Sequence, residues 1–129
     1  MRITDLLKKE SISLNRVLAS KSDAIDALID LHEMAGNISD KDAYKKAILA
    51  REAQGSTAVG NGVAIPHAKT SAVAKPGLSA ITAPAGVDYE ALDGNPSNLL
   101  FMIAAPEDGD LHLEVLSRLM PLLMDESFR

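Results

Sequence analysis

Apolar residues recur at helical spacing in the first third of the chain. Ser20 and Asp23 have the spacing of a capping box, and the apolar positions after them continue at helical period until Gly36. These positions are Ala24, Ile25, Leu28, Leu31 and Ala35. Four acidic residues share the opposite face, Asp23, Asp26, Asp30 and Glu33, a pattern typical of a solvated surface and not of a metal site. The pattern predicts an amphipathic helix.

A second helix is predicted directly after the first. Ser39 and Asp42 repeat the capping-box spacing, and the helix is expected to run to about Gln54 and end before Gly55. Its buried stripe consists of Tyr44, Ala47 and Ile48. Arg51 follows these residues at intervals of seven, four and three, so we expect it to point inward on the same stripe. The alternative is an ion pair with Glu52 or Asp110.

Short apolar segments between turn residues predict strands in the second half of the chain. The expected strands are Val63–Ile65, Leu78–Thr82 and Leu99–Ala105, the last apolar throughout, as for a strand covered on both faces. Glycine and proline favour an edge strand at Gly86–Tyr89 and a turn at Leu92–Pro96. Strands mixed with helices predict a layered α/β fold.

The two ends of the chain carry weaker patterns. Met1–Glu10 is interpreted as a short amphipathic turn of helix. A third long helix is expected from Leu111, with an inward stripe of His112, Val115, Leu116, Leu119 and Leu123, and with a kink or early end at Pro121. This helix is apolar almost all round, which predicts an exposed patch unless further chain covers it, and with the patch either self-association or lower stability.

Composition narrows the classes of function. The chain has 129 residues, 47% of them hydrophobic, and no cysteine, which suits one domain in a reducing compartment. The net charge is −5 and the basic residues are scattered, which argues against nucleic-acid binding. The longest apolar run, Leu99–Ala105, is too short to span a membrane, and the first residues lack a secretory signal. We therefore expect a cytoplasmic protein without direct membrane insertion.

Each of the three histidines has an interpretation from its position. His32 lies beside the apolar face of the first helix, where packing is the favoured role. His67 follows Pro66 and a glycine-rich loop, so it is either a presented functional side chain or an ordinary loop histidine. His112 falls in the first turn of its helix on the inward stripe, where it caps the helix or faces an anion.

Phosphoryl chemistry suits the residue types found here. Imidazole is largely uncharged at neutral pH and is a competent nucleophile, and the fork of an arginine such as Arg51 binds phosphate oxygens. The glycines do not form a nucleotide loop, because Asn61 and Gly62 stand where Lys and Ser or Thr would follow Gly60. No two histidines have a metal-ligand spacing, so we expect neither metal nor cofactor.

These residues resemble a known signature. Arg51-Glu52, Ser56-Thr57 and the run from Gly60 to His67 are similar to the motif of fructose/mannitol-type enzyme IIA domains of the bacterial sugar phosphotransferase system. Downstream, the run from Leu99 to Pro106 and the segment from Leu111 to Leu116 resemble the second conserved block of that family, including its second histidine. The resemblance covers essentially the whole chain and favours the fructose-type members over the mannitol-type.

The resemblance implies a fold, partners and residue roles. It implies a mixed β-sheet flanked by helices, with His67 accepting a phosphoryl group from the phosphocarrier protein HPr and passing it to a IIB domain. It also implies that His112 lies beside His67, that Arg51 contributes positive charge, and that no metal or nucleotide takes part. Members normally continue into a further helix, so residues 1–129 are expected to be a single domain that lacks its C-terminal helix or begins a longer chain.

Two alternatives to this function stay open at the level of sequence. One is a regulatory IIA-like phosphoprotein that is phosphorylated on the same histidine but signals instead of serving a transporter. The other is a non-catalytic domain that binds an anionic ligand through His67, His112 and Arg51. Acid-labile phosphate on His67 distinguishes a carrier from an anion-binding domain.

Overall fold

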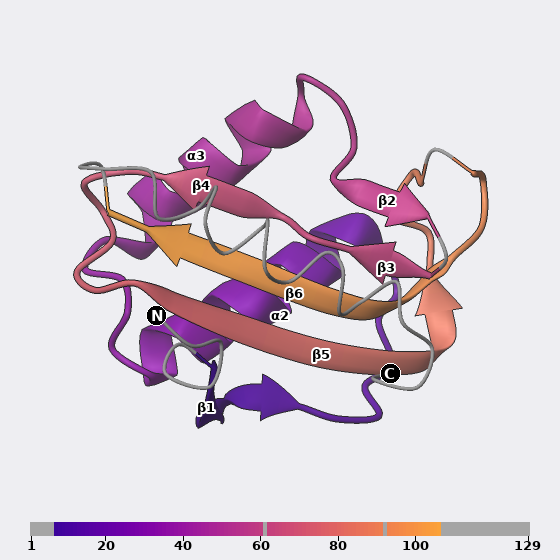
Figure 1. Cartoon of the computed structure of the whole chain (residues 1–129), viewed down its shortest axis with the longest axis horizontal. Coiled ribbons are helices and arrows are strands. Elements are labelled where there is room, and N and C mark those ends of the chain that lie inside the picture. Colours follow the sequence, from indigo (N-terminus) through magenta and orange to yellow (C-terminus); the bar gives the residue numbers. More distant parts are fainter. Residues whose placement is uncertain (1–6, 61, 92, 107–129) are drawn as a thin grey trace.

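The protein folds into one mixed β-sheet whose one face is covered by two helices, which lie behind the sheet in Figure 1. The computed structural model describes residues 7–60, 62–91 and 93–106. The elements in chain order are β1 Leu7–Ser13, α2 Lys21–Met34, α3 Lys41–Glu52, β2 Ala58–Gly60, β3 Val63–Ala64, β4 His67–Lys69, β5 Gly77–Val87 and β6 Ser97–Ala105. The predicted α/β class with a mixed sheet flanked by helices is confirmed.

Helix α2 begins and ends where its sequence pattern predicts. The Ser20 side chain accepts a hydrogen bond from the backbone N–H of Asp23, which satisfies one of the donors that a helix start leaves unpaired. The helix ends at Met34, and Gly36 follows with a φ of 76°, a conformation that glycine adopts without strain. The apolar stripe of α2 is buried against β5, β6 and β1.

Helix α3 is capped by a different residue from the one predicted. Asp40, not Ser39, is the N-cap, and its carboxylate accepts from the N–H of Ala43. The Ser39 hydroxyl instead donates to the carbonyl of Ala72, because the adjacent Ile38 forms a β-bridge with Val73. The helix ends at Glu52, slightly before the predicted end.

Strand β6 is the centre of the sheet, as its apolar run predicts. It pairs antiparallel with β5 and parallel with both β3 and β4, in the order β1-β5-β6-β3-β2. The predicted edge strand at Gly86–Tyr89 is wrong, since Gly86 and Val87 form the end of β5, where Val87 pairs with Ser97 beyond an irregularity in the register.

Three segments form strands that the sequence pattern did not predict. Leu7–Glu10 is part of β1 and not a turn of helix, because β1 pairs in parallel with β5 at one edge of the sheet. Strands β2 and β4 fall in the expected loop, where β2 pairs with the neighbouring β3 and β4 pairs with the distant β6. Tertiary pairing thus overrides weak local propensity.

The two helices are joined on their outer side by ion pairs. Lys41 pairs with Asp30 and Glu33, and Lys45 with Asp26, so the acidic face predicted for α2 serves as a partner for α3. The hydrogen bond from Lys41 to Asp30 raises the pKa of the lysine, with the surrounding carboxylates adding to the effect. No helix of the described segments is long and apolar enough to cross a membrane.

The predicted third helix, its inward stripe and Pro121 lie outside the described residues.

Candidate functional site

His67 opens strand β4 and is held by its backbone to the centre of the sheet. Its Cα lies opposite that of Ile103 on β6, and the Ile103 N–H donates to the carbonyl of Pro66 at 3.0 Å. Pro66, which has no N–H of its own, separates β4 from β3, so His67 begins a new strand instead of ending the one predicted at Val63–Ile65. The imidazole is half-buried.

The His67 ring is oriented by a backbone carbonyl. Its Nδ1 lies 3.0 Å from the carbonyl oxygen of Ile65. A carbonyl oxygen can only accept, so Nδ1 carries the proton and donates it. The neutral ring therefore keeps its lone pair on Nε2, which makes Nε2 the nucleophilic nitrogen.

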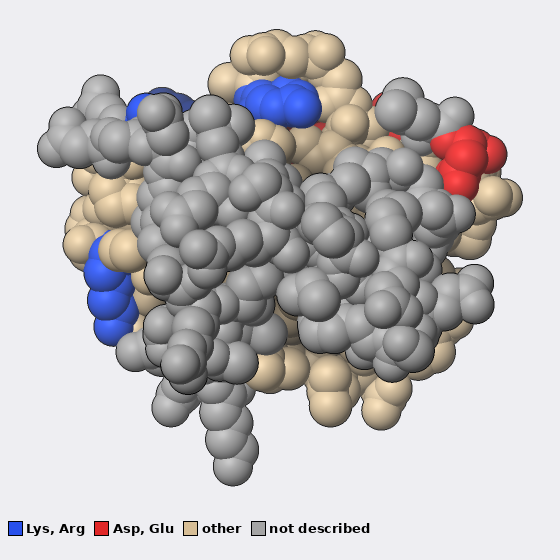
Figure 2. All heavy atoms as spheres, viewed as in Figure 1, with Lys and Arg blue, Asp and Glu red and all other residues tan. Residues whose placement is uncertain are grey.

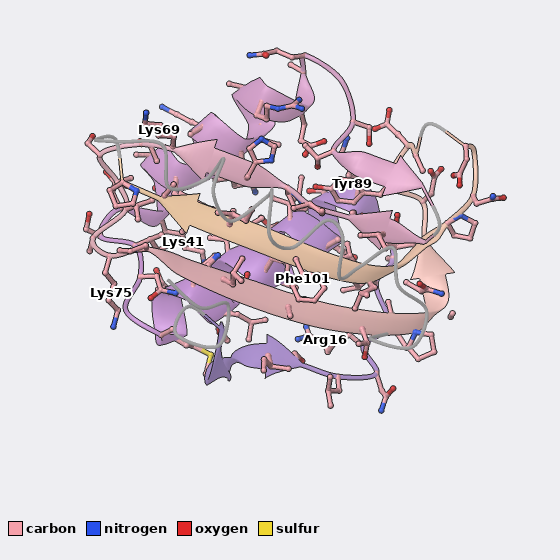
Figure 3. The ribbon with its side chains drawn as sticks, in the orientation of Figure 1. Arg16, Lys41, Lys69, Lys75, Tyr89 and Phe101 are labelled. Atoms are coloured by element: carbon pink, nitrogen blue, oxygen red, sulfur yellow. The ribbon has the colours of Figure 1, made fainter. Side chains whose placement is uncertain are left out.

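Two cationic side chains share a pocket with His67. The pocket has a volume of about 430 Å³ and lies between α3 and β4. Its lining residues are Ala47, Ala50, Arg51, Gln54, His67, Ala68 and Lys69. Lys69 lies two residues after His67, on the same side of the strand, at the end of β4 in Figure 3. On the face seen in Figure 2, lysine and arginine side chains lie along the upper and left rim of the described part.

Arg51 is one of the residues that line this pocket. It is half-buried, and its Nη1 donates to the carbonyl of Gly55 at 2.9 Å. It extends the stripe of Tyr44 and Ile48 as predicted, but it does not enter the core. Of the two acids considered as ion-pair partners, Glu52 pairs with Lys21 instead, and Asp110 lies outside the described residues.

Tyr44, on helix α3, supports the site by bonding to the central strand β6. Its ring is fully buried, and its hydroxyl donates to the carbonyl of Ile103 at 2.9 Å, opposite His67 on β6. Burial raises the pKa of Tyr44, so the hydroxyl stays a neutral donor at physiological pH. This hydrogen bond holds helix α3, which carries Arg51, against β6, the strand with which His67 pairs.

His32 is a packing residue, as predicted. Its side chain is completely buried, with Nε2 3.0 Å from the carbonyl of Met102 and Nδ1 3.0 Å from the amide nitrogen of Asn37. Nε2 therefore donates and Nδ1 accepts, which fixes a neutral ring that packs edge-on to Tyr44. Burial lowers its pKa to about 4.

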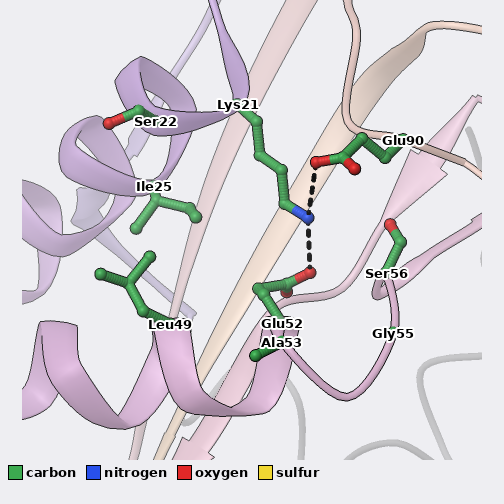
Figure 4. A pocket seen from close by; sticks show the side chains of 9 residues that line it. All are labelled: Lys21, Ser22, Ile25, Leu49, Glu52, Ala53, Gly55, Ser56 and Glu90. Atoms are coloured by element: carbon green, nitrogen blue, oxygen red, sulfur yellow. Dashed lines mark ion pairs between the residues drawn. The ribbon is translucent and has the colours of Figure 1, made fainter.

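Two residues near the site were not singled out for function by sequence reasoning. Lys69 becomes conspicuous only once His67 and Lys69 are known to share a strand, because alternate residues then face the same side. Glu52 was named as a possible partner for Arg51 and as part of the resembling motif, but no role of its own was assigned to it. It lines a second pocket of about 560 Å³ beside the start of α2, together with Lys21 and Glu90 (Figure 4).

The chemistry available at the described site is that of an uncharged nucleophile beside positive charge. Arginine and lysine favour an anion, and the imidazole Nε2 supplies a lone pair to attack phosphorus. Within the part of the chain that the structure describes, no group of three or more His, Cys, Asp or Glu residues has the geometry to hold a metal ion. The third predicted site residue, His112, lies outside that part.

The sequence of this chain matches a known family and known proteins. Residues 5–129 match the family model described as "Phosphoenolpyruvate-dependent sugar phosphotransferase system, EIIA 2". The chain is also 50% identical, over 130 aligned residues, to the fructose-specific EIIABC component of Bacillus subtilis (strain 168). That alignment covers 100% of this chain but only 20% of the relative, so the chain spans about a fifth of that protein.

Two solved structures share the fold. The nitrogen regulatory protein IIA-Ntr from Neisseria meningitidis superposes with a TM-score of 0.87 at 31% identity, covering 95% of this chain and 84% of that one. The enzyme IIA-Mtl of Escherichia coli, solved in complex with phosphorylated enzyme IIB-Mtl, superposes with a TM-score of 0.81 at 29% identity. Here the coverage is 95% of this chain and 85% of the other.

Proposed function

The chain belongs to the EIIA 2 family of the phosphoenolpyruvate-dependent sugar phosphotransferase system, and on this premise we propose that it carries a phosphoryl group on Nε2 of His67. The observation that carries the proposal is the hydrogen bond between His67 Nδ1 and the Ile65 carbonyl. It leaves the nucleophilic lone pair on the other ring nitrogen, in a pocket that also contains Arg51 and Lys69.

The transfer step needs positioning and positive charge more than bond-making groups. The Nε2 lone pair attacks phosphorus while the bond from phosphorus to the donor breaks, and its electron pair returns to the donor. Nδ1 keeps its proton throughout, so the Ile65 carbonyl partly offsets the positive charge that develops on the ring. Arg51 and Lys69 stabilise the negative charge on the phosphoryl oxygens.

The donor and acceptor that we propose are the protein HPr and a IIB domain. The E. coli relative in complex with phosphorylated enzyme IIB-Mtl supports the second partner. The identity to a fructose-specific component favours fructose as the sugar whose uptake and phosphorylation the transfer serves. We place the reaction in the cytoplasm. By family resemblance, His112 assists the transfer without bearing the phosphate.

The test is phosphoryl transfer in a defined mixture. Purified chain is incubated with enzyme I, HPr and phosphoenolpyruvate, and phosphate on the chain is measured by mass spectrometry before and after mild acid. We expect one acid-labile group on His67, which passes to a fructose-type IIB domain when the isolated phosphorylated chain is mixed with that domain. Replacing Arg51 by methionine should slow acceptance about a hundredfold. A chain that acquires no phosphate on His67 contradicts the proposal.

A regulatory role is the second candidate, because the N. meningitidis structure with a TM-score of 0.87 is a nitrogen regulatory protein. The same mixture separates the two roles. A phosphorylated chain that transfers to no IIB domain of the host is the result expected of a regulator, whereas rapid transfer to a fructose-type IIB domain is the result expected of a carrier.

A further inference from the structure

A buried carboxylate lies at the C-terminal end of α3, next to Arg51 in sequence. The side chain of Glu52 is only 6% exposed. One oxygen accepts from the backbone N–H of Thr57 at 3.1 Å, and the other accepts from the Thr57 hydroxyl and from the Tyr89 hydroxyl, the latter at 3.3 Å. Burying a carboxylate costs free energy unless hydrogen-bond partners compensate it. These contacts therefore hold the Glu52 side chain in this position.

The hydrogen bonds of Glu52 lead through the backbone to the His67 ring. Glu52 holds Thr57 through both its N–H and its hydroxyl. The carbonyl of Thr57 accepts from the N–H of Ile65 at 3.0 Å. The carbonyl of that same Ile65 accepts from Nδ1 of His67. The Ile65 carbonyl selects the tautomer of His67. Its position depends on Glu52 through two hydrogen bonds, one from Thr57 to Glu52 and one from Ile65 to Thr57.

The same loop also holds the arginine. Arg51 donates to the carbonyl of Gly55, which lies between Glu52 and Thr57 in the chain. On its far side the loop is tied to Tyr89, because the Ser56 hydroxyl donates to the Tyr89 carbonyl at 2.7 Å. The loop from Gly55 to Thr57 thus has two supports, and both Arg51 and the His67 segment contact it.

A lysine side chain pairs with the buried carboxylate of Glu52. The Lys21 Nζ lies 3.1 Å from a carboxylate oxygen of Glu52 and 3.5 Å from one of Glu90 (Figure 4). The same ammonium lies 4.8 Å from the centre of the Tyr89 ring. Burial, together with the charge of Glu52, raises the pKa of Tyr89, so its hydroxyl remains a donor. The N–H and hydroxyl of Thr57, the hydroxyl of Tyr89 and the Lys21 ammonium thus converge on a single carboxylate.

We propose that Glu52 is a positioning residue that sets the tautomer of His67 and the placement of Arg51 through the Gly55–Thr57 loop. This role rests on the proposed phosphoryl transfer for its consequence, but the tautomer itself is a property of the protein before any phosphate arrives. Glu52 touches neither His67 nor the pocket that Arg51 and Lys69 line. Its effect on the reaction is therefore indirect.

The experiment measures the ring nitrogens of His67 directly. In the unphosphorylated chain at pH 8, two-bond ¹H–¹⁵N spectra report which nitrogen bears the proton. We expect the Nδ1–H form in the wild type and a shift toward the Nε2–H form, which free histidine prefers, in Glu52→Ala. The rate of acceptance from phospho-HPr should fall about tenfold to a hundredfold, as expected for a misplaced nucleophile. Glu52→Gln should retain most of both, because its amide still has partners for Thr57.

Glu90→Gln is the matched control, since it removes the exposed carboxylate from the same lysine without touching Thr57. It should leave tautomer and rate unchanged. Thr57→Val removes one of the two hydrogen bonds from Thr57 to Glu52. It should shift the His67 tautomer toward the Nε2–H form, as Glu52→Ala does, but by a smaller amount. A folded Glu52→Ala chain with the wild-type tautomer overturns the proposal, as does an equal shift in Glu90→Gln. If the wild type accepts no phosphate while Glu52→Ala still changes tautomer, the proposed function fails and the positioning role stands.

Discussion

Two histidines in this chain show how environment separates structure from chemistry. His32 is completely buried between α2 and β6, and both ring nitrogens have fixed partners within the core. His67 is half-buried at the start of β4, and a backbone carbonyl fixes one nitrogen while the ring lines an open pocket with two cations. The side chain is the same in both places. Burial and partners make the first inert and leave the second nucleophilic.

The largest expected effect is the loss of phosphate acceptance in His67→Ala. The substitution removes the only nitrogen that we propose to bear the phosphoryl group, yet it leaves the β4 backbone pairing with β6 intact. We expect no labelling above background and a Tm within a few degrees of the wild type. Mass spectrometry and differential scanning calorimetry measure the two properties. Full labelling of a folded variant would falsify the central proposal.

For His32→Ala we expect a loss of stability with phosphate acceptance retained. The variant leaves a cavity and deprives the Asn37 amide and the Met102 carbonyl of their partner. Both effects destabilise the fold, together by about 3–5 kcal/mol. Urea unfolding followed by circular dichroism measures the loss. The folded fraction should still accept phosphate at the wild-type rate, and a catalytic defect without a stability defect would reverse the comparison between the two histidines.

Lowering the pH should destabilise the wild-type fold through His32, without any substitution. Its pKa is about 4 in the folded protein, against an ordinary value of 6.5. As the pH falls below 6.5 the unfolded chain binds a proton that the folded chain does not, so stability decreases until about pH 4. The loss from this residue amounts to at most about 3 kcal/mol. Urea titrations at pH 7, 5.5 and 4.5 measure it, and His32→Gln, which cannot titrate, should have a shallower pH dependence.

A smaller effect is expected from Gly77→Ala. A Cβ at this position would lie 2.2 Å from Nδ2 of Asn37, which is itself nearly fully buried. Asn37 must then move and lose its hydrogen bond to His32, at a cost of about 2 kcal/mol. Combining the substitution with Asn37→Ala should relieve the clash, so the two stability losses should be less than additive. Strict additivity would mean that Asn37 is not the obstacle.

Sequence alone predicts the elements whose signals are local. The cap of α2, the stop at Gly36 and the apolar strand β6 follow from spacing and propensity within a few residues. Strands β1 and β4 do not, because Leu7–Glu10 is rich in charge and His67–Lys69 is only three residues long. Both become strands through pairing with residues far along the chain, which no local pattern encodes.

The candidate site divides in the same way. His67 and Arg51 were found from residue type, spacing and family resemblance. Lys69 depends on recognising β4 as a strand, and Glu52 on knowing that the chain folds back so that Thr57 and Tyr89 meet at one carboxylate. A network of this kind depends on distances between residues remote in sequence, and a single sequence contains no record of them.

The pairing of His67 with β6 also governs when the site can form during synthesis. Strand β4 emerges from the ribosome before β5 and β6, yet its backbone partners are Ile103, Ala104 and Ala105 at the end of β6. Until β6 has been translated, the histidine segment lacks the strand that sets its conformation. We therefore expect a nascent chain to acquire α2 and α3 early and the proposed phosphoryl acceptor, His67, in its folded position late, so that an incomplete polypeptide would not withdraw phosphate from the proposed donor.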